Sequence, residues 1–420
     1  MMEELMYFVW QQKLYKSLLT ADGLPLEVVH PGLRNVELGP DFFNAKVRFD
    51  GVTWAGNVEM HIKSSDWNRH HHQDNRAYDS VILHVVLNHD EQIFLHDGSE
   101  LKTVIMQVPD NLLRSYYDLC GYPDAVSGQA PLLPGQRLPY QGIACASRLP
   151  EVPRLIIHDW SNALAVERLI GKMKRIQHLI DDDLKSWDEG FYTLLLRSLG
   201  SGTNSDAMER LARSLPYSCL LHHRDNLLQL RALLLGQAGL IDDQSADGKE
   251  LKREYEFLHN KFSLRPLESH IWKFSRIRPN ASPMVRLEAF ARIVNQHPNL
   301  LSECCSKLSV EHFCQLFRTP GIGAQTLQII IINAIIPTLS AYFRWQNQED
   351  ECEQLIALLE DLPAESNRFI TQWQACGIKA ENALESQALL HLAQNYCQPH
   401  KCLQCRIGYW LLKHTKQEGK

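Results

Sequence analysis

Four ionisable residues near the start of the chain, two acids followed by a histidine and a lysine, have the types and spacing to hold and use a metal ion. Glu59, His61 and Lys63 alternate with apolar residues, which predicts a strand with these three side chains on one face. Asp41 precedes a neighbouring apolar segment, so a hairpin would bring it toward Glu59. Charges buried between strands need a partner, usually a divalent cation. The pattern predicts Mg²⁺ or Mn²⁺ held by Asp41 and Glu59; the alternative is an exposed sheet edge whose charges serve solubility.

Such a site would suit the hydrolysis of phosphodiester bonds. Two carboxylates hold the metal ion, which lowers the pKa of a bound water, while another group aligns that water or stabilises the developing charge. We assign the metal to Asp41 and Glu59, and the other role to His61 or Lys63. Glu4, in a predicted opening helix, is a further candidate carboxylate.

Histidines in the same region offer a rival metal site. His61, the run His70 to His72, and His84 fall within a short span, and His84 interrupts an otherwise apolar strand. Imidazole suits transition metals, so this cluster favours a histidine-metal hydrolase acting on a small substrate. Two plainer interpretations stay open: the run is a solvated surface, and His84 is a hydrogen-bonded core residue. If His84 pairs with His61 across neighbouring strands, both belong to the site.

The elements that would position these residues are a mixture of helices and strands. Apolar residues at helical spacing over residues 4–19 predict an opening helix. Ser65 or Asp66 would cap a short helix before the histidine run, and Asp50-Gly51 is a turn signal between two strands. Strands are expected over residues 42–49, 53–63, 81–88 and 101–108.

Composition along the chain predicts two domains. Residues 1–120 are expected to form an α/β domain with a mixed sheet and helices. Glycine and proline are dense over residues 121–153, which predicts a connecting loop. Over residues 154–420 helical periodicity replaces the strand pattern, so this part is predicted to be an all-α domain that ends in a cysteine-rich metal-binding segment.

A short motif in the first domain resembles a nuclease signature. Gly39-Pro40-Asp41, followed after the hairpin by Val58-Glu59-Met60-His61, resembles the motif of PD-(D/E)XK, or restriction-endonuclease-like, nucleases over roughly the first 110 residues. The resemblance implies a restriction-endonuclease-like fold and metal-dependent cleavage of DNA or RNA. That superfamily usually has lysine two residues after glutamate, where this chain has His61, with Lys63 two residues further on. Because a neutral imidazole supplies less fixed positive charge than an ammonium group, the departure bears on catalysis more than on fold.

Several segments spread over the chain form a second pattern: Gly39-Pro40-Asp41-Phe42, Glu59-Met60-His61, Asp66-Trp67, the strand at residues 81–86, Gly236-Gln237-Ala238-Gly239-Leu240 and the cysteines at 397, 402 and 405. On these segments the whole chain is similar to an uncharacterised bacterial family of unknown function. That resemblance implies no established activity.

Cys397, Cys402 and Cys405 lie within nine residues near the C-terminus. The two-residue gap between the last two lets both sulfurs reach one ion, and Cys397 can add a third ligand. His400 or a distant thiol such as Cys376 is a candidate fourth ligand. Zinc is the default, whereas some nucleases of the resembled superfamily hold an iron–sulfur cluster through three late cysteines and one remote one. The spacing leaves both open, along with unligated thiols.

Composition limits function and location. The 420 residues are 45% hydrophobic and 22% charged, as in an ordinary globular protein, and the net charge of −6 gives no sign of a basic nucleic-acid-binding surface over the whole chain. No run of about 18 apolar residues is evident and the N-terminus is acidic, so we expect a cytoplasmic protein without a membrane partner. The 11 cysteines are then expected to be thiols rather than disulfides.

The leading hypothesis from the sequence is a divalent-metal-dependent nuclease acting on DNA or RNA. The alternative is a catalytically degenerate protein, either nucleic-acid-associated or a scaffold, with the helices as its partner surface. The second alternative is the histidine-metal hydrolase of a small substrate. The sequence does not specify protein partners.

Overall fold

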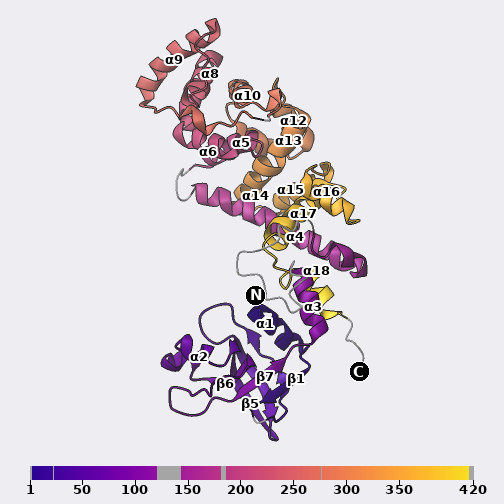
Figure 1. The fold of residues 1–420 in the computed structure, drawn as a ribbon. Helices are drawn as coiled ribbons and strands as arrows, with labels where there is room; N and C mark the ends of the chain where they lie inside the picture. Colours follow the sequence, from indigo (N-terminus) through magenta and orange to yellow (C-terminus); the bar gives the residue numbers. More distant parts are fainter. Residues whose placement is uncertain (1, 22, 121–142, 181–185, 276, 416–420) are drawn as a thin grey trace. The chain divides into compact units, whose positions relative to one another are not determined.

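The chain forms two compact units. One contains residues Met1–Trp160 and Leu392–Lys420, and the other contains Ser161–His391. The first unit holds a mixed sheet with helices and the second is helical, which confirms the predicted fold class. The computed structural model describes residues 2–21, 23–120, 143–180, 186–275 and 277–415 (Figure 1).

This division differs from the expected domains at the C-terminus. The all-α domain was predicted to run to residue 420, but the segment from Leu392 onward groups with the first unit. In that segment, the ring of Tyr409 packs edge-on against Phe8, with centroids 5.1 Å apart, and Arg148 Nη2 donates to the Leu411 carbonyl at 3.2 Å. Of the predicted connecting loop at 121–153, residues 121–142 lie outside the described residues.

Seven strands form one sheet in the first unit. Their order is β1-β7-β6-β5-β4-β2, and β3 also pairs with β4. The central strands β5, β6 and β7 are parallel, whereas β4 is antiparallel to β5 and β1 is antiparallel to β7. The strands are β1 Ser17–Thr20, β2 Glu27–His30, β3 Leu33–Arg34, β4 Phe42–Phe49, β5 Val52–Lys63, β6 Val81–Asn88 and β7 Thr103–Gln107.

The opening helix is shorter than predicted. It spans α1, Met2–Gln12, and the predicted continuation to residue 19 is wrong because Ser17–Thr20 forms strand β1. The residues of β1 alternate between half-buried and buried and pair with β7. Pairing with a neighbouring strand therefore overrides the helical spacing of this segment.

The β4–β5 hairpin determines where the candidate acids lie. Asp50 and Gly51 have positive φ values of 50° and 73°, the conformation of the two-residue turn that matches the twist of paired strands. The register places Phe42 opposite Val58. Asp41, just before Phe42, therefore lies beside Glu59, just after Val58.

Among the described residues, four helices lie wholly within the first unit, and short 3₁₀ turns at His72–Asp74 and Arg76–Tyr78 link α2 to β6. Near the C-terminus, α18 packs against α3 (Figure 1). The helices are α1, α2 Asp66–Arg69, α3 Asp110–Leu119 and α18 Arg406–Lys413.

The second unit is a helical array around one large apolar core of leucine, isoleucine and phenylalanine side chains. Its longest helix, α4, begins at Arg154 and so starts in the first unit. The helices are α4 Arg154–His178, α5 Trp187–Leu199, α6 Ser205–Ser214, α7 Tyr217–Leu221, α8 Leu227–Gln237, α9 Ala246–Phe262, α10 Pro283–Gln296, α11 Leu300–Ser306, α12 Val310–Leu316, α13 Ala324–Ile330, α14 Ile336–Trp345, α15 Glu349–Asp361, α16 Arg368–Ala375 and α17 Ala383–Leu392.

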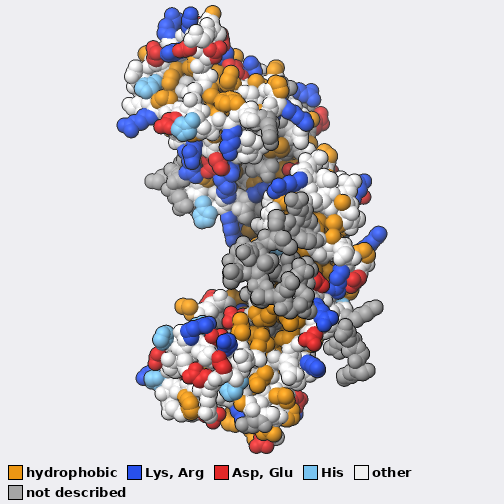
Figure 2. Space-filling view, viewed as in Figure 1, with side chains coloured by type: hydrophobic (Ala, Val, Ile, Leu, Met, Phe, Trp, Pro, Cys, Tyr) orange, Lys and Arg blue, Asp and Glu red, His pale blue; other side chains and the backbone are white. Residues whose placement is uncertain are grey.

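One continuous helix, Ala324–Trp345, is long and apolar enough to cross a membrane by length and composition. However, 72% of its most apolar window is buried inside the protein, as in a core helix. On the face shown in Figure 2, basic and acidic side chains are mixed over both units.

Candidate functional site

The hairpin register brings Asp41 and Glu59 together, and each braces the backbone beside the other. The Asp41 amide donates to Glu59 Oε2 at 3.0 Å, and the Met60 amide donates to Asp41 Oδ2 at 2.9 Å. Glu59 is only 5% exposed. The acids therefore face a protein environment rather than open solvent.

Asp41 is occupied by protein donors. Its Oδ1 lies 3.1 Å from Arg34 Nη1, its Oδ2 accepts from the Met60 amide, and it is hydrogen-bonded to the Tyr7 hydroxyl. The Arg34 guanidinium also stacks 3.5 Å above the Tyr7 ring. With both oxygens engaged, Asp41 is placed to orient Glu59 rather than to be the main metal ligand.

Glu59 directs its other oxygen, Oε1, toward two imidazoles. His72 Nε2 lies 3.3 Å away and His61 Nε2 lies 3.7 Å away. The buried Nε2 of His72 has no hydrogen-bond partner among the described residues, so its contact with Glu59 is close without hydrogen-bond geometry. A nitrogen and an oxygen that face one another in this way can share a cation.

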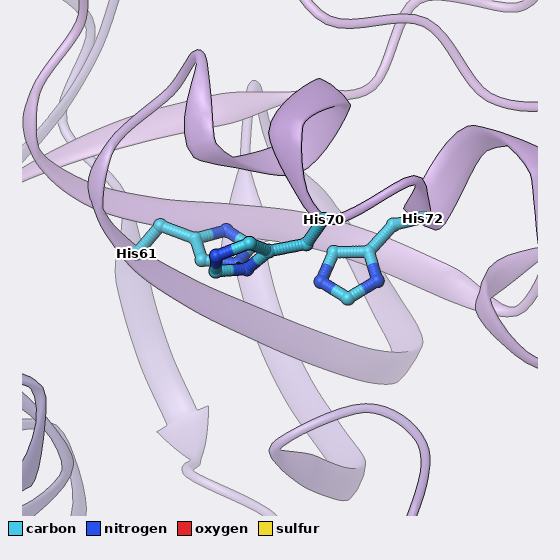
Figure 3. Close-up of side chains that lie close together, drawn as sticks. All are labelled: His61, His70 and His72. Carbon is cyan, nitrogen blue, oxygen red and sulfur yellow. The ribbon is translucent and has the colours of Figure 1, made fainter.

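A third imidazole completes the cluster. His61 Nε2 lies 3.2 Å from His70 Nδ1. One ring nitrogen from each of His61, His70 and His72 lies within 4.8 Å of the others. Figure 3 shows His61, His70 and His72 directing their rings into a common space, with His61 on β5 and the other two on the segment that follows it. Of the described residues, only this trio brings three potential metal-binding side chains so close together.

Behind the cluster lies His84, which is fully buried on β6. Its Nε2 is 2.8 Å from His61 Nδ1, so the condition under which both histidines belong to the same cluster is met. A proton on His61 Nδ1 would leave the Nε2 lone pair directed at the cluster, which is the tautomer that a metal ligand needs. His84 is therefore a positioning residue for His61.

Burial shifts the pKa values of the cluster away from the charged forms. Desolvation, followed by the neighbouring imidazoles of His84, His72 and His70, lowers the pKa of His61 to about 2. Desolvation raises the pKa of Glu59 to about 8, and desolvation with the Glu59 charge raises the pKa of Asp41 to about 6. Because burial lowers the pKa values of His61 and His72, their imidazoles are neutral at physiological pH and have lone pairs to offer. The raised pKa values of the two carboxyls indicate that no nearby cation fully offsets their burial.

Aromatic side chains form one wall of the site. The His72 ring stacks on Tyr78 at a centroid distance of 3.9 Å, and Trp67 packs edge-on against His72 at 5.3 Å. Trp67 is fully buried in a small apolar cluster with Tyr78, Val81, Ile93 and Leu101. This wall keeps water from one side of the imidazoles and limits where a ligand can enter.

Several residues singled out in the sequence lie elsewhere. Lys63 is exposed at the end of β5. Glu4 is exposed and interacts electrostatically with Tyr116, whereas its neighbour Glu3 raises the pKa of Glu59. His71, in the middle of the histidine run, is exposed and lies 3.5 Å from Asp74.

The late cysteines lie in the first unit, apart from the histidines in sequence. Cys402 Sγ donates to the Leu119 carbonyl at 3.3 Å and is hydrogen-bonded to Cys120. Cys376, a candidate fourth ligand, belongs to the second unit. The sequence interpretation missed Cys120, as it missed Arg34, because only the tertiary fold brings these residues to their partners.

Comparison with known proteins identifies the family but not an activity. No curated protein and no solved structure matches the chain. The resemblance to PD-(D/E)XK nucleases is not confirmed by these comparisons and stays a prediction. One family model, described as a protein of unknown function (DUF2851), matches residues 3–321 and 318–368. The chain therefore belongs to this family, as its full-length resemblance to an uncharacterised family indicated.

Proposed function

We propose that the protein is a metal-dependent hydrolase of phosphodiester bonds, with a divalent transition-metal ion held by Glu59, His61, His70 and His72. The observation that carries the proposal is the convergence of Glu59 Oε1 with the imidazole nitrogens of His72, at 3.3 Å, and His61, at 3.7 Å. His70 Nδ1 lies 3.2 Å from His61 Nε2 and supplies the remaining donor.

The donor set decides the class of metal. Three imidazole nitrogens and one carboxylate oxygen suit Zn²⁺, Mn²⁺ or Fe²⁺, whereas Mg²⁺ prefers oxygen ligands. The Mg²⁺ or Mn²⁺ site predicted from two carboxylates would need Asp41 to turn an oxygen from Arg34 or Met60 toward the ion. Of the metals considered from the sequence, Mn²⁺ and Zn²⁺ therefore fit the histidine centre better than Mg²⁺ does.

The residues around the metal would have distinct roles. A bound metal ion supplies a water of lowered pKa and a charge that stabilises the reacting group. Asp41 holds the backbone next to Glu59, and His84 holds His61. Arg34 interacts electrostatically with Glu59, and Arg69, 69% exposed, does so with His61.

Arg34 is paired with Asp41 and Arg69 with Asp66, and a phosphate ester would take over a guanidinium from one of these carboxylates. A phosphate ester is the proposed substrate class because a planar guanidinium pairs well with phosphate oxygens. The resemblance of Asp41 and Glu59 to the PD-(D/E)XK motif supports the same class. DNA or RNA is therefore the proposed substrate. A test must distinguish this activity from two other outcomes. One is cleavage of a small phosphodiester alone, and the other is binding of nucleic acid without cleavage.

The test compares wild-type protein with His72→Ala, Glu59→Gln and the matched control His71→Asn. Asparagine tolerates the left-handed conformation of residue 71, where φ is 59°. Each protein is mixed with Mn²⁺, Zn²⁺, Fe²⁺ or Mg²⁺ and with labelled single-stranded and double-stranded DNA and RNA. A small chromogenic phosphodiester forms a separate arm.

We expect metal-dependent cleavage by wild type and by His71→Asn, and a loss of at least about 100-fold in His72→Ala and Glu59→Gln. Cleavage of the small ester alone would move the substrate from nucleic acid to a small molecule. Nucleic-acid binding without cleavage under every metal would overturn the hydrolase proposal in favour of a degenerate site.

A further inference from the structure

Cysteines from three distant segments converge in the first unit. Cys402 is hydrogen-bonded to Cys120, at the end of α3, and Cys397 interacts electrostatically with Cys405 and with Cys145. Cys402 interacts in the same way with Cys397 and Cys405. The convergence joins parts of the chain that are more than 250 residues apart. A cysteine that serves only as a small apolar side chain does not need other cysteines beside it.

Backbone amides at the start of α18 lie beside the Cys405 sulfur. Burial raises the pKa of the Cys405 thiol, and hydrogen bonds from the amides of Gly408 and Ile407 offset part of that effect. A Cβ at Gly408 would lie 2.3 Å from the Cys402 carbonyl oxygen, so glycine lets the helix approach the Cys402 turn. Hydrogen bonds from amides to cysteine sulfurs are one way in which a protein stabilises a metal-bound thiolate.

We propose that Cys397, Cys402 and Cys405, with a fourth thiol from Cys120 or Cys145, bind a thiolate-coordinated metal centre that fastens the C-terminal segment to the first unit. The proposal is independent of the histidine centre and of phosphodiester cleavage. It replaces Cys376 as the remote ligand, because that residue belongs to the second unit.

Spacing separates the two kinds of thiolate centre. A zinc ion with bonds of about 2.3 Å holds its sulfurs about 3.8 Å apart in a tetrahedron. Within the described residues, the only three candidate ligand atoms that lie within 4.8 Å of one another belong to histidines, so no three of the thiols lie that close. An iron–sulfur cluster holds its cysteines farther apart, and the C-x4-C-x2-C order of Cys397, Cys402 and Cys405 also occurs in iron–sulfur proteins.

The experiment measures metal and acid-labile sulfide in full-length protein purified without oxygen. The His72→Ala variant serves as background, so that metal at the histidine centre does not contribute. An iron–sulfur cluster gives sulfide together with iron and a visible absorption that bleaches on reduction. A zinc centre gives zinc without sulfide, and Co²⁺ substitution then gives sulfur-to-metal charge-transfer bands.

In this background, Cys402→Ser and Cys405→Ser are expected to lose the metal, and so is either Cys120→Ser or Cys145→Ser. Cys376→Ser is the matched control and should retain the full content. A second readout does not depend on how variants fold: in unmutated protein, alkylation of Cys397, Cys402 and Cys405 should be blocked until a chelator or oxidant removes the metal. Freely alkylated thiols with no bound metal, or equal metal content in all of these variants, would overturn the proposal.

Discussion

Replacement of Glu59 by glutamine should stabilise the metal-free protein while it destroys the metal site. In the folded protein, burial raises the pKa of Glu59 from 4.5 to about 8, so the folded state keeps a proton that the unfolded state has lost. The unfolded state then binds fewer protons than the folded state, and stability falls as pH rises between about 4.5 and about 8. Glutamine has the same shape and does not titrate.

The size of the effect follows from the shift. Each pKa unit corresponds to about 1.4 kcal/mol, so the protonation of Glu59 costs the folded state on the order of 3 kcal/mol at pH 7. Glu59→Gln should therefore raise the free energy of unfolding of the first unit by a value of that order in the presence of EDTA. It should also remove the Glu59 contribution to the fall, which is seen most clearly between about pH 6.5 and pH 8, above the range in which the raised pKa of Asp41 contributes.

Metal should reverse the order. A divalent ion at 1,000 times its Kd stabilises a folded protein by about 4.1 kcal/mol, which exceeds the gain of Glu59→Gln, and the variant lacks the charged ligand that this stabilisation needs. Hydrogen exchange by mass spectrometry, read from β5 and β6 peptides across a urea series, measures the first unit separately from the second. Glu27→Gln is the matched control, because Glu27 is an exposed acid of the same sheet, paired with Arg48 at 3.0 Å. A Glu59→Gln variant that is less stable than wild type in EDTA at pH 8 would refute the reasoning.

Three further predictions concern the helical unit. Gly236→Ala should lower the free energy of unfolding by about 1–3 kcal/mol in urea titrations, because the added Cβ would lie 2.2 Å from the Tyr255 ring; Gly171→Ala, with nothing within 4 Å, should be neutral or stabilising. Burial lowers the pKa of Lys172 from 10.5 to about 7, so the folded state binds fewer protons than the unfolded state between these values and the free energy of unfolding should rise from pH 7 to pH 9.5. Lys172→Met should lower the slope of that rise by the equivalent of up to about one proton. An unchanged slope in the variant would contradict the prediction. Asn367→Ala should lower the free energy of unfolding by about 1 kcal/mol, because the Asn367 side chain accepts hydrogen bonds from the Phe369 and Ile370 amides at the start of α16. Faster hydrogen exchange of the α16 amides would show this loss.

The hairpin and its two acids could be predicted from sequence because the signals are local. Asp50-Gly51 specifies the turn, and the alternation around Glu59 specifies which side chains share a face. Once the register is correct, Asp41 must lie next to Glu59. On the parallel neighbour strand, His84 lies opposite Glu59 and Val86 lies opposite His61. The alternation places His61 and His84 on one face, whereas their contact depends on a strand register that the alternation does not specify.

The closure of the metal site could not be predicted in the same way. The chain turns at His71, where φ is 59°, and this turn lets His70 and His72 reach the cluster. The side chain of His71, between them, is exposed instead. Arg34 lies on a two-residue strand whose pairing with β4 leaves no pattern in the sequence. Long-range packing decides all of these positions.

The grouping of the C-terminal segment with the sheet likewise depends on contacts between residues far apart in the chain. Thr415 Oγ1 donates to Ser115 Oγ at 3.3 Å, and Arg148 reaches the carbonyl of Leu411. Helical periodicity from residue 154 onward reports that these residues form helices, but it does not report which unit each helix joins. The spacing of the late cysteines is informative, yet the remote thiols near them are found only in the fold.

The most direct test of the metal centre is a crystal of the full-length protein grown with Mn²⁺ or Zn²⁺, with anomalous diffraction recorded above and below the absorption edge of that metal. We expect an anomalous peak bounded by Glu59, His61, His70 and His72, at about 2.0–2.2 Å from the imidazole nitrogens and the carboxylate oxygen. An anomalous map with no peak there, from crystals whose metal concentration saturates the protein in solution, would contradict the assignment of these residues as a metal site.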